Sequence, residues 1–163
     1  CIYGKDYTYV RMGSVDLDLG SEWYTYVEGA QFKFLYADYD IANPFHNDIG
    51  MIHLYDNAVL SANVQPIALP LATDTNLAGL QSVVTGFTSD GSDPRMVLRH
   101  IGFPVMSDAW CQIQHAHRMQ PNMICTDTLG VFSPCFIDSG SPLHMTISGA
   151  RRIVGGEKKG QKI

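Results

Sequence analysis

The chain has 163 residues, of which 45% are hydrophobic, 10% aromatic and 17% charged, a composition that excludes an intrinsically disordered protein and indicates a globular one. Its 11 Lys and Arg residues against 16 Asp and Glu residues give a net charge of −5, which argues against nucleic acid or an anionic membrane as partner. No stretch approaches the apolar length of a membrane span.

Short strand-like segments dominate the chain, and turn-forming residues separate them. These segments are rich in β-branched and aromatic residues or form short apolar runs. They are residues 6–13, 22–36, 48–55, 81–87 and 97–106. One helix is predicted over residues 107–119, where Ser107 or Asp108 can cap the N-terminus.

Residues 61–76 contain two prolines and little periodicity, which is typical of a connector. The strand-like segments lie on both sides of it. The sequence therefore predicts an all-β fold made of two halves, each of which we expect to be a β-barrel.

Ser139 is a candidate nucleophile, since it follows an acidic residue on a short turn in SPCFIDSGSPL, residues 133–143. A serine hydroxyl becomes a strong nucleophile only when a histidine accepts its proton, and that histidine needs a carboxylate to orient it. The alternative interpretation of Ser139 is a polar loop residue, and that of Asp48 is a turn residue at the start of a strand.

Three blocks in order resemble the trypsin/chymotrypsin family of serine peptidases. They are NDIGMIHL at 47–54, ANVQPIALP at 62–70 and MICTDTLGVFSPCFIDSGSPL at 123–143. The resemblance implies a double Greek-key β-barrel fold, truncated at both ends. It assigns residues 1–60 to the remainder of an N-terminal barrel, 61–76 to the inter-barrel connector and 77–163 to an incomplete C-terminal barrel that carries the nucleophile.

The resemblance assigns Asp48 as the triad aspartate and Ser139 as the nucleophile. In the family the catalytic histidine immediately precedes a cysteine that Cys1 matches, so we expect it upstream of Cys1 and expect residues 1–163 alone to be inactive. Two other histidines lie near Asp48. We interpret His46 as an exposed loop side chain and His53 as a half-buried strand residue, rather than as replacements for the base.

The family's oxyanion hole maps onto the backbone amides of Ile137 and Ser139, where Ile137 replaces a glycine. A β-branched residue there can turn the amide away, and one lost donor costs on the order of 10²–10³ in rate. Asp138 matches the residue that pairs with the new N-terminus after zymogen cleavage.

The specificity pocket maps onto Ser133, Pro134 and Phe136. Ser133 lies where the family places the residue at the pocket base. An aspartate there selects Lys and Arg, whereas a neutral serine suits large apolar or aromatic side chains. The resemblance therefore implies a chymotrypsin-like preference.

The resemblance also pairs Cys111 with Cys125 in a short disulfide loop, and it places the partners of Cys1 and Cys135 outside residues 1–163. The alternative is that all four cysteines are reduced. His115 and His117 form a His-x-His pair without a visible third ligand, so we interpret them as surface residues and expect no metal and no cofactor.

The sequence RRIVGG at residues 151–156 has two interpretations. It is similar to the site at which family zymogens are cut, and it also lies at the distance from Ser139 where relatives have a strand. The spacing favours the strand.

Three functions are weighed. The first is a secreted serine endopeptidase made as a zymogen, a monomer with peptide or protein substrates and proteinaceous inhibitors as partners. The second is a non-catalytic peptidase homologue that acts as a binding or regulatory module. The third, an all-β binding protein with chance motifs, predicts that the Cys111–Cys125 bridge is absent.

Overall fold

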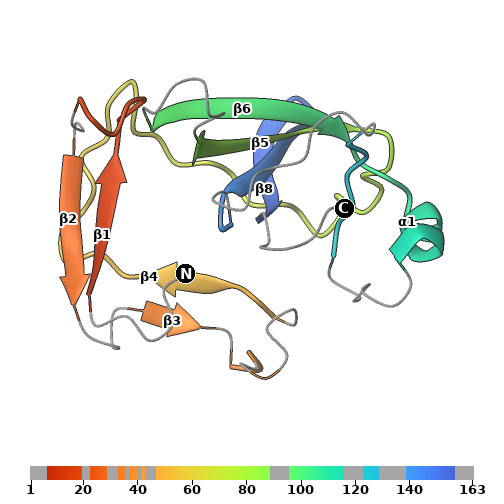
Figure 1. Cartoon of the computed structure of the whole chain (residues 1–163), viewed down its shortest axis with the longest axis horizontal. Helices are drawn as coiled ribbons and strands as arrows, with labels where there is room; N and C mark the ends of the chain where they lie inside the picture. Colours follow the sequence, from red (N-terminus) through yellow and green to blue (C-terminus); the bar gives the residue numbers. More distant parts are fainter. Residues whose placement is uncertain are drawn as a thin grey trace. The chain divides into compact units, whose positions relative to one another are not determined.

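The computed structural model describes residues 7–19, 23–28, 33–35, 37–39, 42, 47–88, 96–115, 123–128 and 139–156 (Figure 1). The chain divides into two compact units, Cys1–Gln65 and Pro66–Ile163. In the described residues, strands far outnumber helices, which confirms the all-β fold class. The assignment of the two units to two incomplete barrels remains a prediction.

The first unit contains two antiparallel strand pairs. β1 (Tyr7–Met12) pairs with β2 (Trp23–Glu28), and β3 (Lys33–Leu35) pairs with β4 (Gly50–Ile52). The predicted segment 22–36 thus contains two strands, and the predicted segment 48–55 contributes only three strand residues. The β3–β4 register from Lys33↔Ile52 to Leu35↔Gly50 pairs every residue of β3, so β4 is no longer than its partner.

The second unit is built on a four-stranded antiparallel sheet with the order β6-β5-β7-β8. Its strands are β5 (Gln81–Thr88), β6 (Val97–Pro104), β7 (Pro142–Ile147) and β8 (Ala150–Gly156). Ser148 and Gly149 join β7 to β8, and both have positive φ angles, 50° and 79°. Two consecutive positive φ values are what a two-residue hairpin turn requires, because its twist then matches that of the strands.

The core of the second unit lies on one face of this sheet. Val84 lies opposite Leu143, and Ser82 lies opposite both Phe103 and Met145, so these side chains share a face. All five residues are buried. On β5 and β7 the core positions are accordingly two residues apart, Ser82 and Val84 on one strand and Leu143 and Met145 on the other.

The only α-helix among the described residues is α1 (Asp108–His115), which begins where the sequence predicts. Ser107 is its N-cap, since Ser107 Oγ accepts a hydrogen bond from the Trp110 N–H at 3.2 Å and its carbonyl accepts one from Cys111 N–H at 2.9 Å. Residues 116–119 of the predicted helix lie outside the described residues. No helix in the described part of the chain is both long and apolar enough to cross a lipid bilayer.

A disulfide joins Cys111 on α1 to Cys125, with the two Cα atoms 6.0 Å apart. This confirms the predicted pairing. It contradicts the hypothesis of a binding protein with chance motifs, which expects no bridge between these two cysteines. The segment that carries Cys125 is also held to the end of β6, because Met106 N–H donates to the Cys125 carbonyl and Asp127 N–H donates to the Pro104 carbonyl, both at 2.9 Å.

Candidate functional site

Asp48 lies in a tight turn directly before β4, on the surface of the first unit. The turn is closed by Ile49 N–H, which donates to the Asn47 carbonyl at 2.8 Å across Asp48. Asn47 adopts a φ of 51°, and its side-chain Nδ2 donates to the Asp38 carbonyl at 3.1 Å. Asparagine tolerates this left-handed conformation better than most residues, so the Asn-Asp sequence itself sets the turn that presents Asp48.

Ser139 lies in a turn with Gly140, three residues before β7 begins at Pro142. Gly140 has a φ of 91°, a conformation that side chains with a Cβ rarely adopt. Ser139 is half-buried as a residue, and its Oγ atom is buried. The sequence therefore fixes a sharp bend next to Ser139 through one glycine.

β7 anchors this turn to the core of the second unit. Leu143 and Met145 are buried and pair with β5, while Pro142 pairs with Gly156 on β8. A Cβ on Gly156 would lie 3.6 Å from the Ser141 carbonyl oxygen, so β8 closely approaches the chain between Ser139 and β7. Two neighbouring strands thus hold the start of β7 and position the turn that contains Ser139.

Asp48 belongs to the first unit and Ser139 to the second. Asp48 lies in a turn at the start of a strand and Ser139 lies in a turn, positions that both the catalytic and the alternative interpretation of these residues expect. Their approach to each other across one site remains a prediction.

Several predicted site residues lie outside the described residues. They are Cys1, His46, His117, Ser133, Pro134, Cys135, Phe136, Ile137 and Asp138. The oxyanion hole, the specificity pocket and the activation-linked aspartate therefore remain predictions from the sequence.

The interpretation of His53 as a half-buried strand residue is wrong. β4 ends at Ile52, and His53 is exposed. The apolar run 48–55 suggested a longer strand, but among the described residues β4 pairs with β3 only from Gly50 to Ile52.

A buried histidine, His144 on β7, was missed by the sequence analysis. It lines a cavity of about 240 Å³ in the second unit, together with Leu80, Gln81, Val83, Met145, Thr146 and Arg151. Burial lowers the pKa of His144 below its ordinary 6.5, and the charges of Arg151 and His100 lower it further. No motif contains this histidine, and its pairing with Val83 on β5 is visible only in the structure.

Within the described residues, no group of three or more His, Cys, Asp or Glu side chains is arranged to hold a metal ion. The chemistry that this chain offers at Asp48 and Ser139 is that of a carboxylate and a hydroxyl.

Comparison with known proteins gives consistent matches over nearly the whole chain. A sequence model of the family described as Trypsin matches residues 1–157. Trypsin-1 of Astacus astacus is 30% identical over 164 residues, covering 95% of this chain and 68% of that protein. Cationic trypsin-3 of Rattus norvegicus is 29% identical over 138 residues, covering 82% of this chain and 54% of that protein.

A longer relative matches over the same region. Vitamin K-dependent protein C of Mus musculus is 28% identical over 166 residues, covering 95% of this chain and 36% of that protein. The chain thus spans between about a third and two thirds of the length of these three relatives.

Proposed function

The chain belongs to the trypsin family, and we propose that its function is that of a serine endopeptidase, which cleaves peptide bonds through an acyl-enzyme intermediate. The observation that carries this proposal is a family match over residues 1–157, which includes the sequence blocks around both Asp48 and Ser139. Both residues lie in turns that their neighbours Asn47 and Gly140 set through positive φ angles.

In the proposed reaction, Ser139 Oγ attacks the carbonyl carbon of the substrate's scissile bond, and a histidine accepts the hydroxyl proton. The same histidine then donates that proton to the leaving amine. Asp48 orients the imidazole and stabilises its positive charge. The histidine is the one that the family places directly before the cysteine matched by Cys1, so residues 1–163 by themselves are proposed to be inactive.

The amides of Ile137 and Ser139 are proposed to stabilise the oxyanion that forms during attack. Ser133, Pro134 and Phe136 are proposed to line a pocket for large apolar or aromatic side chains, since Ser133 brings no charge to its base. Asp138 is proposed to pair with the N-terminal amine that zymogen cleavage releases.

The family membership also supports proposals on the protein's setting. Peptides or proteins are the proposed substrates, proteinaceous inhibitors the proposed partners, and secretion as a monomeric zymogen the proposed route. The Cys111–Cys125 disulfide supports the extracellular location, because such bonds persist in oxidising compartments.

A non-catalytic peptidase homologue is the second candidate function. Two observations favour it: Ile137 stands where the family has glycine, and the Oγ of Ser139 is buried. In this case the protein binds peptides or proteins without cleaving them.

A fluorophosphonate probe distinguishes the two functions, because it forms a covalent bond only with an activated serine. The probe is applied to the activated full-length protein, to its Ser139→Ala and Asp48→Asn variants and to residues 1–163 alone. Labelling that disappears in Ser139→Ala supports the peptidase. An absence of labelling in a correctly cut full-length protein supports the homologue, and labelling of residues 1–163 alone would contradict the assigned role of the missing histidine.

Specificity is tested with chromogenic peptides that differ only in the residue before the scissile bond. The activated protein is expected to prefer Phe, Tyr, Leu and Met over Lys and Arg. Faster cleavage after Arg or Lys would contradict the role proposed for Ser133.

A further inference from the structure

The dibasic sequence RRIVGG lies inside the folded second unit rather than on a cleavable loop. Arg151 and Arg152 are strand residues of β8, and β7 pairs with them through Thr146↔Arg151 and Met145↔Arg152. The structure therefore confirms the strand interpretation of this motif. β7 pairs with one edge of β8 and leaves the other edge to a different segment.

The connector covers that other edge. Ala68 forms a parallel bridge with Arg152, and the backbone N–H of Ile153 donates to the Ala68 carbonyl at 3.0 Å. The nitrogen of Ile153 is the amide nitrogen of the Arg152–Ile153 peptide bond. The connector therefore holds the very amide that a peptidase would have to break after Arg152.

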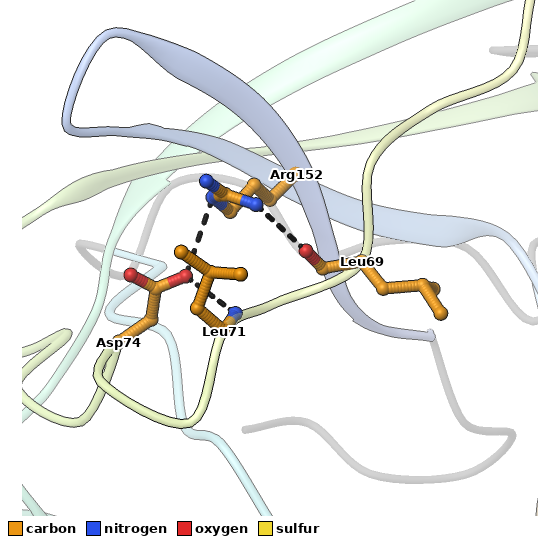
Figure 2. Close-up of polar contacts among 4 residues, drawn as sticks. All are labelled: Leu69, Leu71, Asp74 and Arg152. Carbon is orange, nitrogen blue, oxygen red and sulfur yellow. Dashed lines mark hydrogen bonds and ion pairs between the residues drawn. The ribbon is translucent and has the colours of Figure 1, made fainter.

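The side chain of Arg152 is held as well (Figure 2). Its Nη1 donates to the Leu69 carbonyl at 2.8 Å, and its Nε lies 3.3 Å from Asp74 Oδ2. The Nε contact is an ion pair and not an aligned hydrogen bond, since Nε has no hydrogen-bond partner within the described part of the chain. The side chains are only 13% exposed for Arg152 and 7% for Asp74.

Asp74 is itself fixed by a turn of the connector. Its Oδ2 accepts a hydrogen bond from Leu71 N–H at 2.8 Å, and its own N–H donates to the Leu71 carbonyl at 2.9 Å. The same carboxylate oxygen thus closes the connector turn and faces Arg152 (Figure 2). The hydrogen bonds of the turn orient the carboxylate independently of Arg152, which reduces the entropy lost on forming the pair.

We propose that Asp74 and Arg152 form a latch that fastens connector residues 66–74 to β8 and protects the Arg152–Ile153 bond from trypsin-like peptidases. A peptidase of that specificity needs the arginine side chain in its own pocket and an extended, unpaired backbone on both sides of the bond. In the folded chain the connector and β7 occupy both edges of β8, and Leu69 and Asp74 hold the guanidinium. Cleavage then requires that the connector detaches first.

Arg152 is here a residue that another peptidase would cut after, so its protection holds whether or not this protein is itself a peptidase. Asp74 acts by positioning the connector. The sequence RRIVGG is similar to an activation site, but the contacts of Arg152 with Leu69 and Asp74 hold it as a strand. The sequence alone does not reveal these two contacts.

The test is limited proteolysis of the full chain with trypsin under native conditions. Mass spectrometry follows the initial rate at which the fragment beginning with Ile153 appears, compared with a synthetic peptide of residues 148–158. Cleavage of the folded chain is expected to be about 100-fold slower than that of the peptide or more, because only the opened state is cut. Equal rates for the folded chain and the peptide would overturn the proposal.

Asp74→Asn removes the charge but retains an oxygen that can accept from Leu71 N–H. It is expected to raise cleavage after Arg152 by about tenfold, since a charge-assisted contact is lost. Asp56→Asn makes the same chemical change at an exposed aspartate and is expected to leave the rate unchanged. Equal rates for the two variants would overturn the proposal.

Arg152→Lys gives a second variant that trypsin can still cleave. A guanidinium contacts the Leu69 carbonyl through Nη1 and Asp74 through Nε, and a single ammonium group cannot make both contacts in the same geometry. Cleavage after position 152 is therefore again expected to rise. A rate equal to that of the unchanged chain would show that the guanidinium contacts do not protect the bond.

Amide hydrogen exchange distinguishes local release of the connector from unfolding of the whole second unit. In Asp74→Asn the Ile153 amide is expected to exchange faster, while the amide of Val84, a buried residue of β5 that pairs with β6 and β7, is unchanged. An equal acceleration at both amides would mean that the substitution unfolds the whole unit, and this too would overturn the proposal.

Discussion

The side chain of Ser82 donates a hydrogen bond of 2.7 Å to the carbonyl of Phe103, the residue directly opposite it on β6. Ser82 is completely buried, with 0% of its surface exposed. A polar side chain at such a position is tolerated because its hydroxyl has an acceptor within the core. The pair therefore fixes the register of β5 against β6 from inside the core.

Ser82→Ala is expected to destabilise the second unit by about 1–3 kcal/mol, the usual cost of leaving one buried polar group without its partner. Urea denaturation gives the free energy of unfolding. Thr75→Ala, which removes an exposed hydroxyl, is the control and is expected to change stability by less than about 0.5 kcal/mol. Similar effects of the two substitutions would show that the buried hydrogen bond contributes little.

The Cys111–Cys125 disulfide closes a loop between residues 14 positions apart. The chain-entropy model assigns a loop of this length about 3 kcal/mol of stabilisation. The double variant Cys111→Ser, Cys125→Ser is expected to lose about that amount in urea denaturation under oxidising conditions. With a reducing agent present, the unchanged chain should approach the variant, and a difference that persists after reduction would point to packing of the sulfur atoms instead.

Elements with a strong local signal were predicted well from the sequence. β5 and β6 lie within a residue or two of the predicted segments 81–87 and 97–106, because a short apolar run marks the first and alternating apolar residues mark the second. The helix begins at its predicted position because serine is a strong N-cap residue, and the hydroxyl of Ser107 accepts a hydrogen bond from the Trp110 N–H.

Contacts between distant segments were not predictable in the same way. Arg152 contacts the carbonyl of Leu69, 83 positions earlier in the chain, and no periodicity in either segment indicates that they lie together. Periodicity reports which side of a strand is buried, but not which segment covers its edge. For the same reason the sequence did not reveal that residues 66–76 of the connector belong to the second unit.

At the candidate site, too, the sequence predicts local features but not contacts between distant segments. The motifs single out Asp48 and Ser139, and each lies in a turn that its neighbours Asn47 and Gly140 produce. The prediction that they meet concerns two separate units, and a short motif in one unit carries no information on its position relative to the other.

Gly140 is expected to be necessary for the turn at Ser139. Its φ of 91° strains any residue with a Cβ, so Gly140→Ala should destabilise the chain by about 1 kcal/mol or more and displace Ser139. Gly102→Ala is the matched control. A Cβ at Gly102 would meet only the Ser82 carbonyl oxygen at 3.5 Å, an ordinary contact, and no left-handed φ is involved.

Thermal denaturation measures both glycine variants, and fluorophosphonate labelling in the activated full-length protein reports the position of Ser139. Gly140→Ala is expected to melt at a lower temperature and to label more slowly, while Gly102→Ala stays close to the unchanged protein. If Gly102→Ala were the more harmful substitution, backbone conformation at position 140 would not be what positions Ser139.

His144 is expected to make the stability of the second unit depend on pH. Burial lowers its pKa in the folded state, and Arg151 on β8 and His100 on β6 add to the effect. The unfolded chain, with an ordinary pKa of 6.5, then binds more protons than the folded chain between the two pKa values. Stability therefore rises with pH across that window, is fully present above 6.5 and is lost as the pH falls toward the folded-state pKa.

Replacement of the imidazole tests this pH dependence directly. His144→Gln should flatten the dependence of the free energy of unfolding on pH below 6.5, whereas His53→Gln, at an exposed histidine, should leave its slope unchanged. Arg151→Gln should raise the pKa of His144, measured by NMR titration, but not fully to its ordinary value, because burial is the larger cause and remains. A His144→Gln variant with the same pH slope as the unchanged chain would show that protonation of another group, and not of this buried imidazole, opposes folding in acid.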